Sequence, residues 1–125
     1  MALRSFKDLT VWRKAQDLSL NIYQEFANCK DYGFRDQIQR AGISITNNVA
    51  EGYGRQGDKW LINFLIIARG STAEVESMLL MAHRLGYISL RAQKDLLSQT
   101  DEVAKLLTAF INKVGSDVKL TANRQ

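Results

Sequence analysis

The fold is decided by residues 58–85, which read DKWLINFLIIARGSTAEVESMLLMAHRL. Apolar residues recur there at spacings of three and four, the pattern of a helix with one side turned to a core. The whole chain contains no proline, so no proline interrupts this run. The stretch therefore predicts one long helix. We expect one stripe of it to face the core: Trp60, Phe64, Ile67, Ser71, Val75, Met78, Ala82 and Leu85.

The same helix carries a second set of apolar residues on its opposite side, at Ile62, Ile66, Ala73 and Leu80. A helix that is apolar on two sides must be covered on two sides. A chain of 125 residues has few other elements to supply both covers. We therefore expect these four residues to form an oligomer interface with another copy of the chain.

Three further helices are predicted around this stretch, over residues 8–28, 34–53 and 89–114. Each has an apolar stripe at helical spacing. The stripe of the first helix comprises Val11, Ala15, Leu18, Ile22 and Phe26. The stripe of the second comprises Phe34, Ile38, Ala41, Ile45 and Val49.

Small polar residues and glycines mark the expected helix ends. Ser5, Asp58 and Ser89 precede helical patterns and are typical N-caps, because their side chains accept hydrogen bonds from the first turn. Gly86 and Gly115 are expected to end the third and fourth helices.

The connections between these helices are short, which makes sequential neighbours antiparallel. No segment alternates apolar and polar residues over a strand's length, so we expect no sheet. The sequence predicts an all-α protein with a single domain, an antiparallel up-down four-helix bundle over residues 1–115. Residues 116–125 are polar and are expected to form a flexible C-terminal tail.

The chemistry-bearing residues do not form a recognisable active site. The chain has one histidine, His83, and one cysteine, Cys29, which are too few for the usual metal ligand sets. Residues 52–57 spell GYGRQG, but a nucleotide-binding G-x-G-x-x-G follows a strand, and here it follows a helix. We expect a protein without enzymatic activity, metal or cofactor, in the reducing cytoplasm that a lone thiol suits. The longest apolar run is far below the ~20 residues that span a membrane, so no membrane partner is expected.

A polar stripe lies beside the core stripe of the second predicted helix, at Gln37, Arg40, Ser44, Asn48 and Glu51. Polar groups that become buried must find hydrogen-bond partners. Partners of suitable chemistry stand on the third helix, at Arg69, Ser71 and Glu74. Two interpretations stay open: an inter-helix network that fixes register, or a surface or pore lining that contacts a partner.

The net charge of +4 is a mild attraction for polyanions. Arginine and lysine interspersed with aromatic residues suit RNA, because phosphates pair with the cations and bases stack on the rings. Acidic residues are interleaved, so solvated helix faces are the alternative explanation. The candidate nucleic-acid-binding residues are Arg4, Lys7, Arg13, Lys14, Arg35 and Arg55.

Several separated motifs resemble one known family. They are FKDLTVW at 6–12, QIQRA at 37–41, NVAEG at 48–52 and ARGS at 68–71, together with Glu74 and Glu76. In this order they are similar to the four-helix bundle family of 23S rRNA intervening-sequence proteins, often labelled ribosomal-protein-like. The resemblance covers residues 6–114.

This resemblance implies a cytoplasmic bacterial protein. The family is also similar to the accessory protein of diversity-generating retroelements, which forms a ring-like pentamer and partners a reverse transcriptase and nucleic acid. By resemblance, a homopentamer is therefore expected for this chain, with RNA or DNA and a protein such as a reverse transcriptase as further partners.

Two functions follow as hypotheses. The first is a non-catalytic, oligomeric accessory protein that binds structured RNA or other nucleic acid through a basic surface. The alternative is a homo-oligomeric scaffold or adaptor for a protein partner, with no role for nucleic acid.

Overall fold

The structure is a computed structural model that describes residues 5–55 and 57–123, with side chains up to residue 119. Nearly all of these residues lie in helices. A short 3-10 helix, η1 (Phe6–Asp8), precedes four α-helices. Their bounds are α1 Thr10–Glu25, α2 Tyr32–Gly54, α3 Asp58–Arg84 and α4 Leu90–Asn123. None of the described residues lies in a strand, so the expected all-α class is confirmed.

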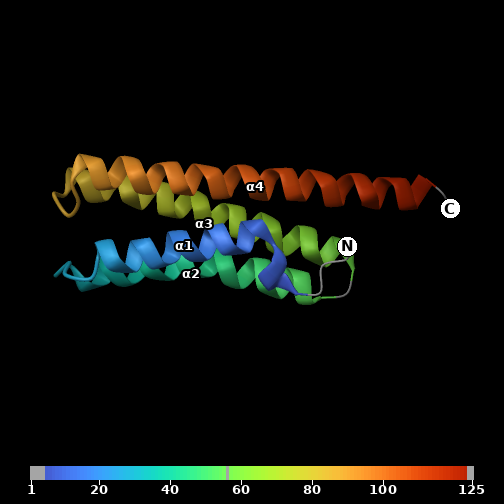
Figure 1. Cartoon of the computed structure of the whole chain (residues 1–125), viewed down its shortest axis with the longest axis horizontal. Helices are drawn as coiled ribbons and strands as arrows, with labels where there is room; N and C mark the ends of the chain where they lie inside the picture. Colours follow the sequence, from blue (N-terminus) through green and yellow to red (C-terminus); the bar gives the residue numbers. More distant parts are fainter. Residues whose placement is uncertain (1–4, 56, 124–125) are drawn as a thin grey trace.

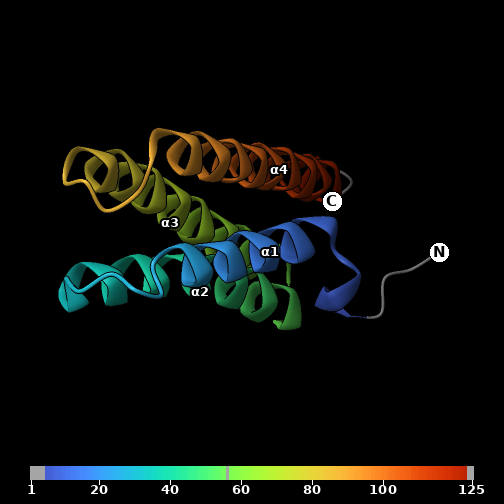
Figure 2. The same cartoon turned by 60° about the vertical axis from the view of Figure 1, so that its left-hand side comes forward.

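The four helices form an antiparallel up-down bundle (Figure 1). Each packs against two others in the cyclic order α1, α2, α3, α4. The α1–α2 and α3–α4 turns lie at one end of the bundle, and the α2–α3 turn lies at the other (Figures 1 and 2). The last part of α4 extends past the α2–α3 turn (Figure 1). None of the helices in the described part of the chain is both long and apolar enough to cross a membrane.

Side-chain caps are found at the starts of η1, α2 and α4, whereas α1 begins after Leu9 without one. Ser5, Asp31 and Ser89 each accept a hydrogen bond from a backbone N–H in the first turn of η1, α2 and α4 respectively. The prediction of Asp58 as an N-cap is wrong, because Asp58 is already the first helical residue of α3. Gly57 takes the N-cap with a φ of 111°, a conformation that the missing Cβ makes accessible.

The core stripes of α1 and α2 agree with the prediction. All five residues of the first stripe, from Val11 to Phe26, are buried. Four of the five in the second stripe, from Ile38 to Val49, are buried, and Phe34 is partly buried at the core's edge. In both helices most of the apolar residues recur on one side, with Leu20 of α1 as an exposed exception, so the periodicity determines which way the helix faces.

The predicted core stripe of α3 is partly wrong. Ser71, Val75, Met78 and Ala82 are buried, but Trp60, Ile67 and Leu85 are 54%, 52% and 48% exposed. The completely buried positions that the prediction missed are Leu65, Ala68 and Leu79. Because α3 is apolar around most of its circumference, spacing alone does not fix the rotation of the helix about its axis.

The predicted end of the last helix at Gly115 is also wrong, since α4 continues to Asn123. The part of the expected tail from 116 to 123 is therefore helical. Val114 is buried and Val118 is half-buried, so the apolar stripe of α4 runs on through the glycine. A glycine inside a helix costs about 1 kcal/mol, which a continuing apolar stripe offsets.

Gly52 allows a close approach between α2 and α3. A Cβ at this position would lie only 2.6 Å from the Phe64 Cβ and 3.4 Å from the Leu61 carbonyl oxygen. The Phe64 Cβ is fixed to the α3 backbone, so it cannot move aside without moving the helix. This contact sets the spacing of the two helices next to their short connection.

We predict that Gly52→Ala lowers the free energy of unfolding by about 1–3 kcal/mol through overpacking. Gly115→Ala is the matched control, because a Cβ there meets nothing within 4 Å. That control should raise stability by about 0.5–1 kcal/mol, the usual gain in a helix interior. Urea denaturation followed by circular dichroism measures both. Equal effects of the two substitutions would contradict the proposed close approach.

A polar contact joins the α1–α2 turn to the α3–α4 turn. The Tyr87 hydroxyl donates to Asp31 Oδ2 at 2.6 Å, while Asp31 Oδ1 accepts from the Phe34 N–H at 3.1 Å. The Phe34 and Tyr87 rings also meet edge to face, with centroids 5.3 Å apart. The Tyr87 hydrogen bond, and after it the backbone bond from Phe34, lower the pKa of Asp31. The same contact with Asp31 raises the pKa of Tyr87.

We predict that Tyr87→Phe destabilises the protein only in a defined pH window. The lowered pKa of Asp31 means that the contact stabilises the fold above about pH 4 and is lost as the pH falls through that lowered pKa. The raised pKa of Tyr87 means that it also persists below about pH 10 and is lost as the pH rises through that raised pKa. The urea midpoints of wild type and variant should therefore converge in acid. Tyr32→Phe, at an exposed ring, should show no such convergence.

Candidate functional site

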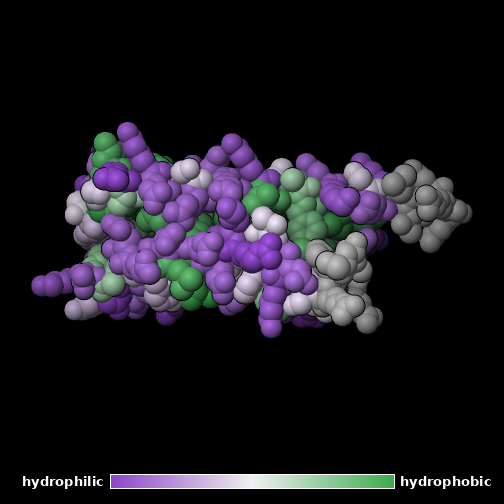
Figure 3. Space-filling view, viewed as in Figure 1, coloured by the Kyte–Doolittle hydropathy of each residue, from purple (hydrophilic) through white to green (hydrophobic). Residues whose placement is uncertain are grey.

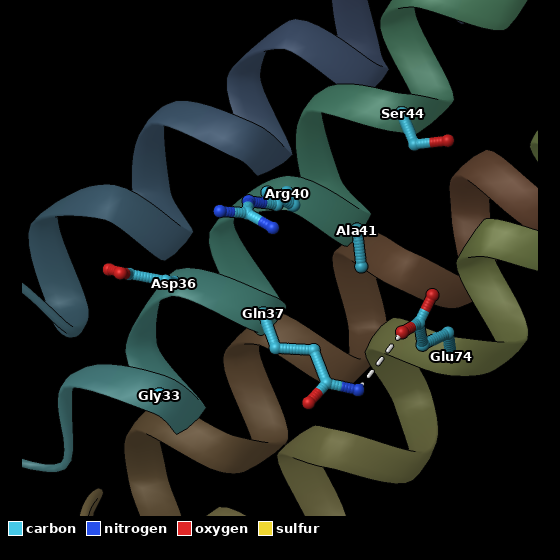
Figure 4. A pocket seen from close by; sticks show the side chains of 7 residues that line it. All are labelled: Gly33, Asp36, Gln37, Arg40, Ala41, Ser44 and Glu74. Carbon is cyan, nitrogen blue, oxygen red and sulfur yellow. Dashed lines mark hydrogen bonds between the residues drawn. The ribbon is translucent and has the colours of Figure 1, made fainter.

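A polar groove lies between α2 and α3, with a volume of about 570 Å³ (Figure 4). We call it the α2–α3 groove; it is lined by Gly33, Asp36, Gln37, Arg40, Ala41, Ser44 and Glu74. The Gln37 Nε2 donates to Glu74 Oε2 at 3.3 Å across it, so two of the predicted network residues meet here. The groove is open to solvent, and its lining contains both acidic and basic side chains.

The floor of the groove continues into a chain of hydroxyl and amide contacts. The Ser44 and Ser71 hydroxyl oxygens are 2.9 Å apart across the α2–α3 interface. The Asn48 side-chain amide donates to the Ser44 carbonyl at 2.7 Å and to the Ser44 hydroxyl at 3.0 Å. Among the described residues, no buried side-chain nitrogen or oxygen lacks a partner. A satisfied chain of this kind fixes the register of two helices.

The remaining members of the predicted network do not join it. Glu51 pairs instead with Arg55, one turn further along the chain, at 3.1 Å. Arg69 reaches the other neighbour of α3, where its Nη1 lies 3.5 Å from the Thr108 hydroxyl of α4. Arg40 makes no hydrogen bond or ion pair with another described residue, and its guanidinium is turned away from Glu74 (Figure 4). Arg40 is thus a cation in the groove wall that is available to a partner.

An exposed apolar surface runs along α3 next to the groove. Of the four residues predicted for an interface, Ile66 and Leu80 are 44% and 47% exposed, Ala73 is exposed and Ile62 is half-buried. Ile67 and Met81 are also exposed apolar residues of α3, and the predicted interface did not include them. We call this surface the outer face of α3; it comprises Ile66, Ile67, Ala73, Leu80 and Met81.

The outer face has the spacing of a helix–helix seam. Ile66, Ala73 and Leu80 are seven residues apart, and the exposed Gly70 and Ser77 lie between them. A Cβ at Gly70 would meet nothing within 4 Å, so no other described residue of this chain covers the middle of the seam. A heptad seam with small residues at its centre and large ones at both ends is suited to close packing against another helix. By contrast, the face of the molecule that includes α1 is mostly hydrophilic, with separate small apolar patches (Figure 3).

The predicted basic residues do not form one site. Lys7, Arg13 and Lys14 are exposed near the start of the bundle, and Arg55 lies at the α2–α3 turn of the same end. Arg35 is at the opposite end. Arg4 lies outside the described residues. The described candidates are therefore split between the two ends of the molecule.

Several of these cations already have intramolecular partners. Lys14 lies 3.3 Å from the Glu102 carboxylate, in a small polar hollow between α1 and α4. Arg35 makes two hydrogen bonds to Asp36 and stacks on an exposed ring. Such exposed pairs are weak, about 0–1 kcal/mol, so a phosphate can compete with them.

The charge is nevertheless uneven along the bundle. We call residues 5–18, 43–71 and 106–119 the basic half, because they lie toward the α2–α3 turn (Figure 1). Lysine and arginine outnumber aspartate and glutamate there. In residues 19–42 and 72–105 the acidic residues outnumber the basic ones. The positive excess of the described chain therefore lies in the half around the α2–α3 turn.

No group of three or more histidine, cysteine, aspartate or glutamate side chains that could hold a metal is found among the described residues. Cys29 is free and partly buried, and His83 lies in the last turn of α3.

The chain is similar to a crystal structure from Bacteroides thetaiotaomicron VPI-5482, described as a protein with unknown function from the S23 ribosomal protein family. The two share 29% sequence identity and superpose with a TM-score of 0.77, over 82% of this chain and 98% of that one. None of the curated proteins compared with the sequence matches it. The sequence profile of the 23S rRNA-intervening sequence protein family matches residues 7–109, most of the bundle. This chain therefore belongs to the 23S rRNA-intervening sequence protein family.

Proposed function

We propose that this protein is a non-catalytic, self-associating accessory protein that binds structured RNA through its basic half. The observation that carries the proposal is the concentration of positive charge at the end that holds the α2–α3 turn. An excess of cations on one end attracts a polyanion more strongly than the same charges spread evenly. The expected cytoplasmic location is compatible with such a target.

Binding of this kind rests on phosphate contacts. Lys7 and Arg13 are exposed, and no side-chain ion pair ties either of them to another described residue. Each phosphate that a cation neutralises releases counterions, so affinity falls steeply with salt. The RNA interaction is therefore expected to be strongly dependent on salt concentration.

We predict that the double charge reversal Lys7→Glu with Arg13→Glu weakens RNA binding and flattens its salt dependence. The slope should fall by about one unit for each phosphate that the protein no longer neutralises. The matched control is Arg84→Glu with Lys94→Glu, which changes the net charge equally in the other half. Fluorescence anisotropy with a labelled RNA hairpin, over a series of salt concentrations, measures both. Equally weakened binding in the two variants would assign the interaction to net charge rather than to the basic half.

Self-association is the second part of the proposal, supported by the outer face of α3. Its exposed isoleucine, leucine and methionine side chains recur along one side of α3, and a gathering of exposed apolar residues of this kind marks an interaction surface. A second copy that covers this face removes the apolar area from water. By resemblance to the retroelement accessory protein, we propose a homopentamer.

We predict that Ile66→Asp or Leu80→Asp lowers the oligomer mass to that of a single chain, because each places a charge in an apolar seam. Leu20→Asp is the matched control, since Leu20 is 55% exposed but lies on α1. Light scattering coupled to size exclusion measures the mass of each variant. A wild-type chain that runs as a monomer would remove this part of the proposal.

A second candidate function is a scaffold or adaptor for another protein, of which a reverse transcriptase is the example that the resemblance offers. The observation in its favour is the unpaired Arg40 in the α2–α3 groove beside the apolar outer face. Apolar surface next to an unpaired arginine is a frequent composition of protein interfaces. An oligomer that ignores RNA at every salt concentration would favour this candidate over the first.

A further inference from the structure

An exposed tryptophan stands in the first turn of α3. Trp60 is 54% exposed, although tryptophan is among the side chains that gain most from burial. The Arg55 guanidinium lies 5.9 Å from the centre of the Trp60 ring and 5.6 Å from that of Phe64. Arg55 is held in turn by Glu51 at 3.1 Å. The ring is thus supported by an ordered cation, while more than half of the residue stays open.

The surroundings of Trp60 are polar, and the exposed Asp58 and the paired Glu51 stand among their cations. Lys59 precedes it, Asn63 is exposed one turn later, and the whole region belongs to the basic half. The cores of protein interfaces are depleted in lysine, whereas sites for single-stranded nucleic acid combine cations with open aromatic rings.

We propose that Trp60 is a stacking platform for an unpaired base of RNA, with Arg55 and Lys59 beside it to contact the neighbouring phosphates. The inference rests on the proposed RNA binding and narrows it to single-stranded segments, such as a loop. A paired base in a duplex is already stacked on both faces, so it cannot lie on the indole ring.

The same motif at the other end of the bundle provides an internal comparison. Tyr32 is 62% exposed and the Arg35 guanidinium lies 4.9 Å above its ring. Arg35 is bound to Asp36, and the surrounding half carries an excess of acidic residues. The two sites share an arginine–aromatic stack and differ in the net charge of the half of the bundle that surrounds them. Charge complementarity therefore favours Trp60 as the RNA site and Tyr32 as its matched control.

The competing occupant of the Trp60 surface is a second copy of the chain. Trp60 lies one heptad before Ile67, so a seam along α3 that reached the first turn would cover the ring. The two occupants leave different signatures in tryptophan fluorescence. A ring buried by a second copy emits at shorter wavelength and responds to protein concentration, whereas a stacked base quenches the emission.

The experiment uses Trp12→Phe as a background, so that Trp60 is the sole tryptophan of the full chain. Short oligoadenylate and a blunt RNA duplex of equal length are titrated at low and moderate salt. We expect saturable quenching by the single strand and little by the duplex. Trp60→Leu, measured by anisotropy with the labelled single strand, should weaken binding about 5- to 100-fold, the usual effect of removing one stacked base. Tyr32→Leu should leave the affinity unchanged.

The outcomes separate this inference from the proposed function. If RNA binds in a salt-dependent manner and Trp60→Leu binds as tightly as wild type, the stacking platform is wrong and the RNA function stands. If no RNA binds at any salt concentration, the proposed function fails and the platform with it. Emission that depends on protein concentration and not on RNA would assign Trp60 to the contact between copies, and would overturn the inference.

Discussion

At Gly52 the backbone of α2 lies so close to α3 that an added methyl group would stand 2.6 Å from the Phe64 Cβ. This approach sits immediately before the short α2–α3 connection and draws the two helices together. The Ser44–Ser71 contact then fixes their register at a distance of 2.9 Å. Together with the packing of α3 against α4, these two contacts determine how α3 is rotated. That rotation decides which of its many apolar residues enter the core.

The rotation of α3 also explains what the sequence can and cannot predict. In α1 and α2 most apolar residues recur on one side, so residues such as Leu18 and Ile45 can be assigned to the core from spacing alone. In α3 nearly every direction is apolar, and spacing allows several rotations. Spacing therefore places Ile67 inward, whereas in the folded chain it lies outward and Leu65 takes the buried position. Only the packing of α3 against α2 and α4 decides whether Ile67 or Leu65 is the buried residue.

The same reasoning applies to the candidate site. Ser44 and Ser71 have short side chains, so helical spacing on two neighbouring helices is enough to predict that they meet. Glu51 and Arg55 have long side chains with a partner one turn away, and the local i, i+4 pair prevails over a contact across the interface. The stack of Arg55 on Trp60 crosses a turn, where no periodicity relates the two residues. Such contacts can be found only in the folded molecule.

In the proposed function, self-association and RNA binding strengthen each other through geometry. The seam from Ile66 to Leu80 and the platform at Trp60 occupy different stretches of α3, since six residues of helix place Trp60 about 9 Å before Ile66. A second copy can therefore cover the middle of the helix while its first turn stays open. An oligomer built on the seam presents several basic ends to one RNA molecule. Linked sites of this kind bind with much higher overall affinity than any one of them, because later contacts form at high effective concentration. A chain whose net charge is only +4 can thus hold RNA firmly without a strongly basic surface on each copy.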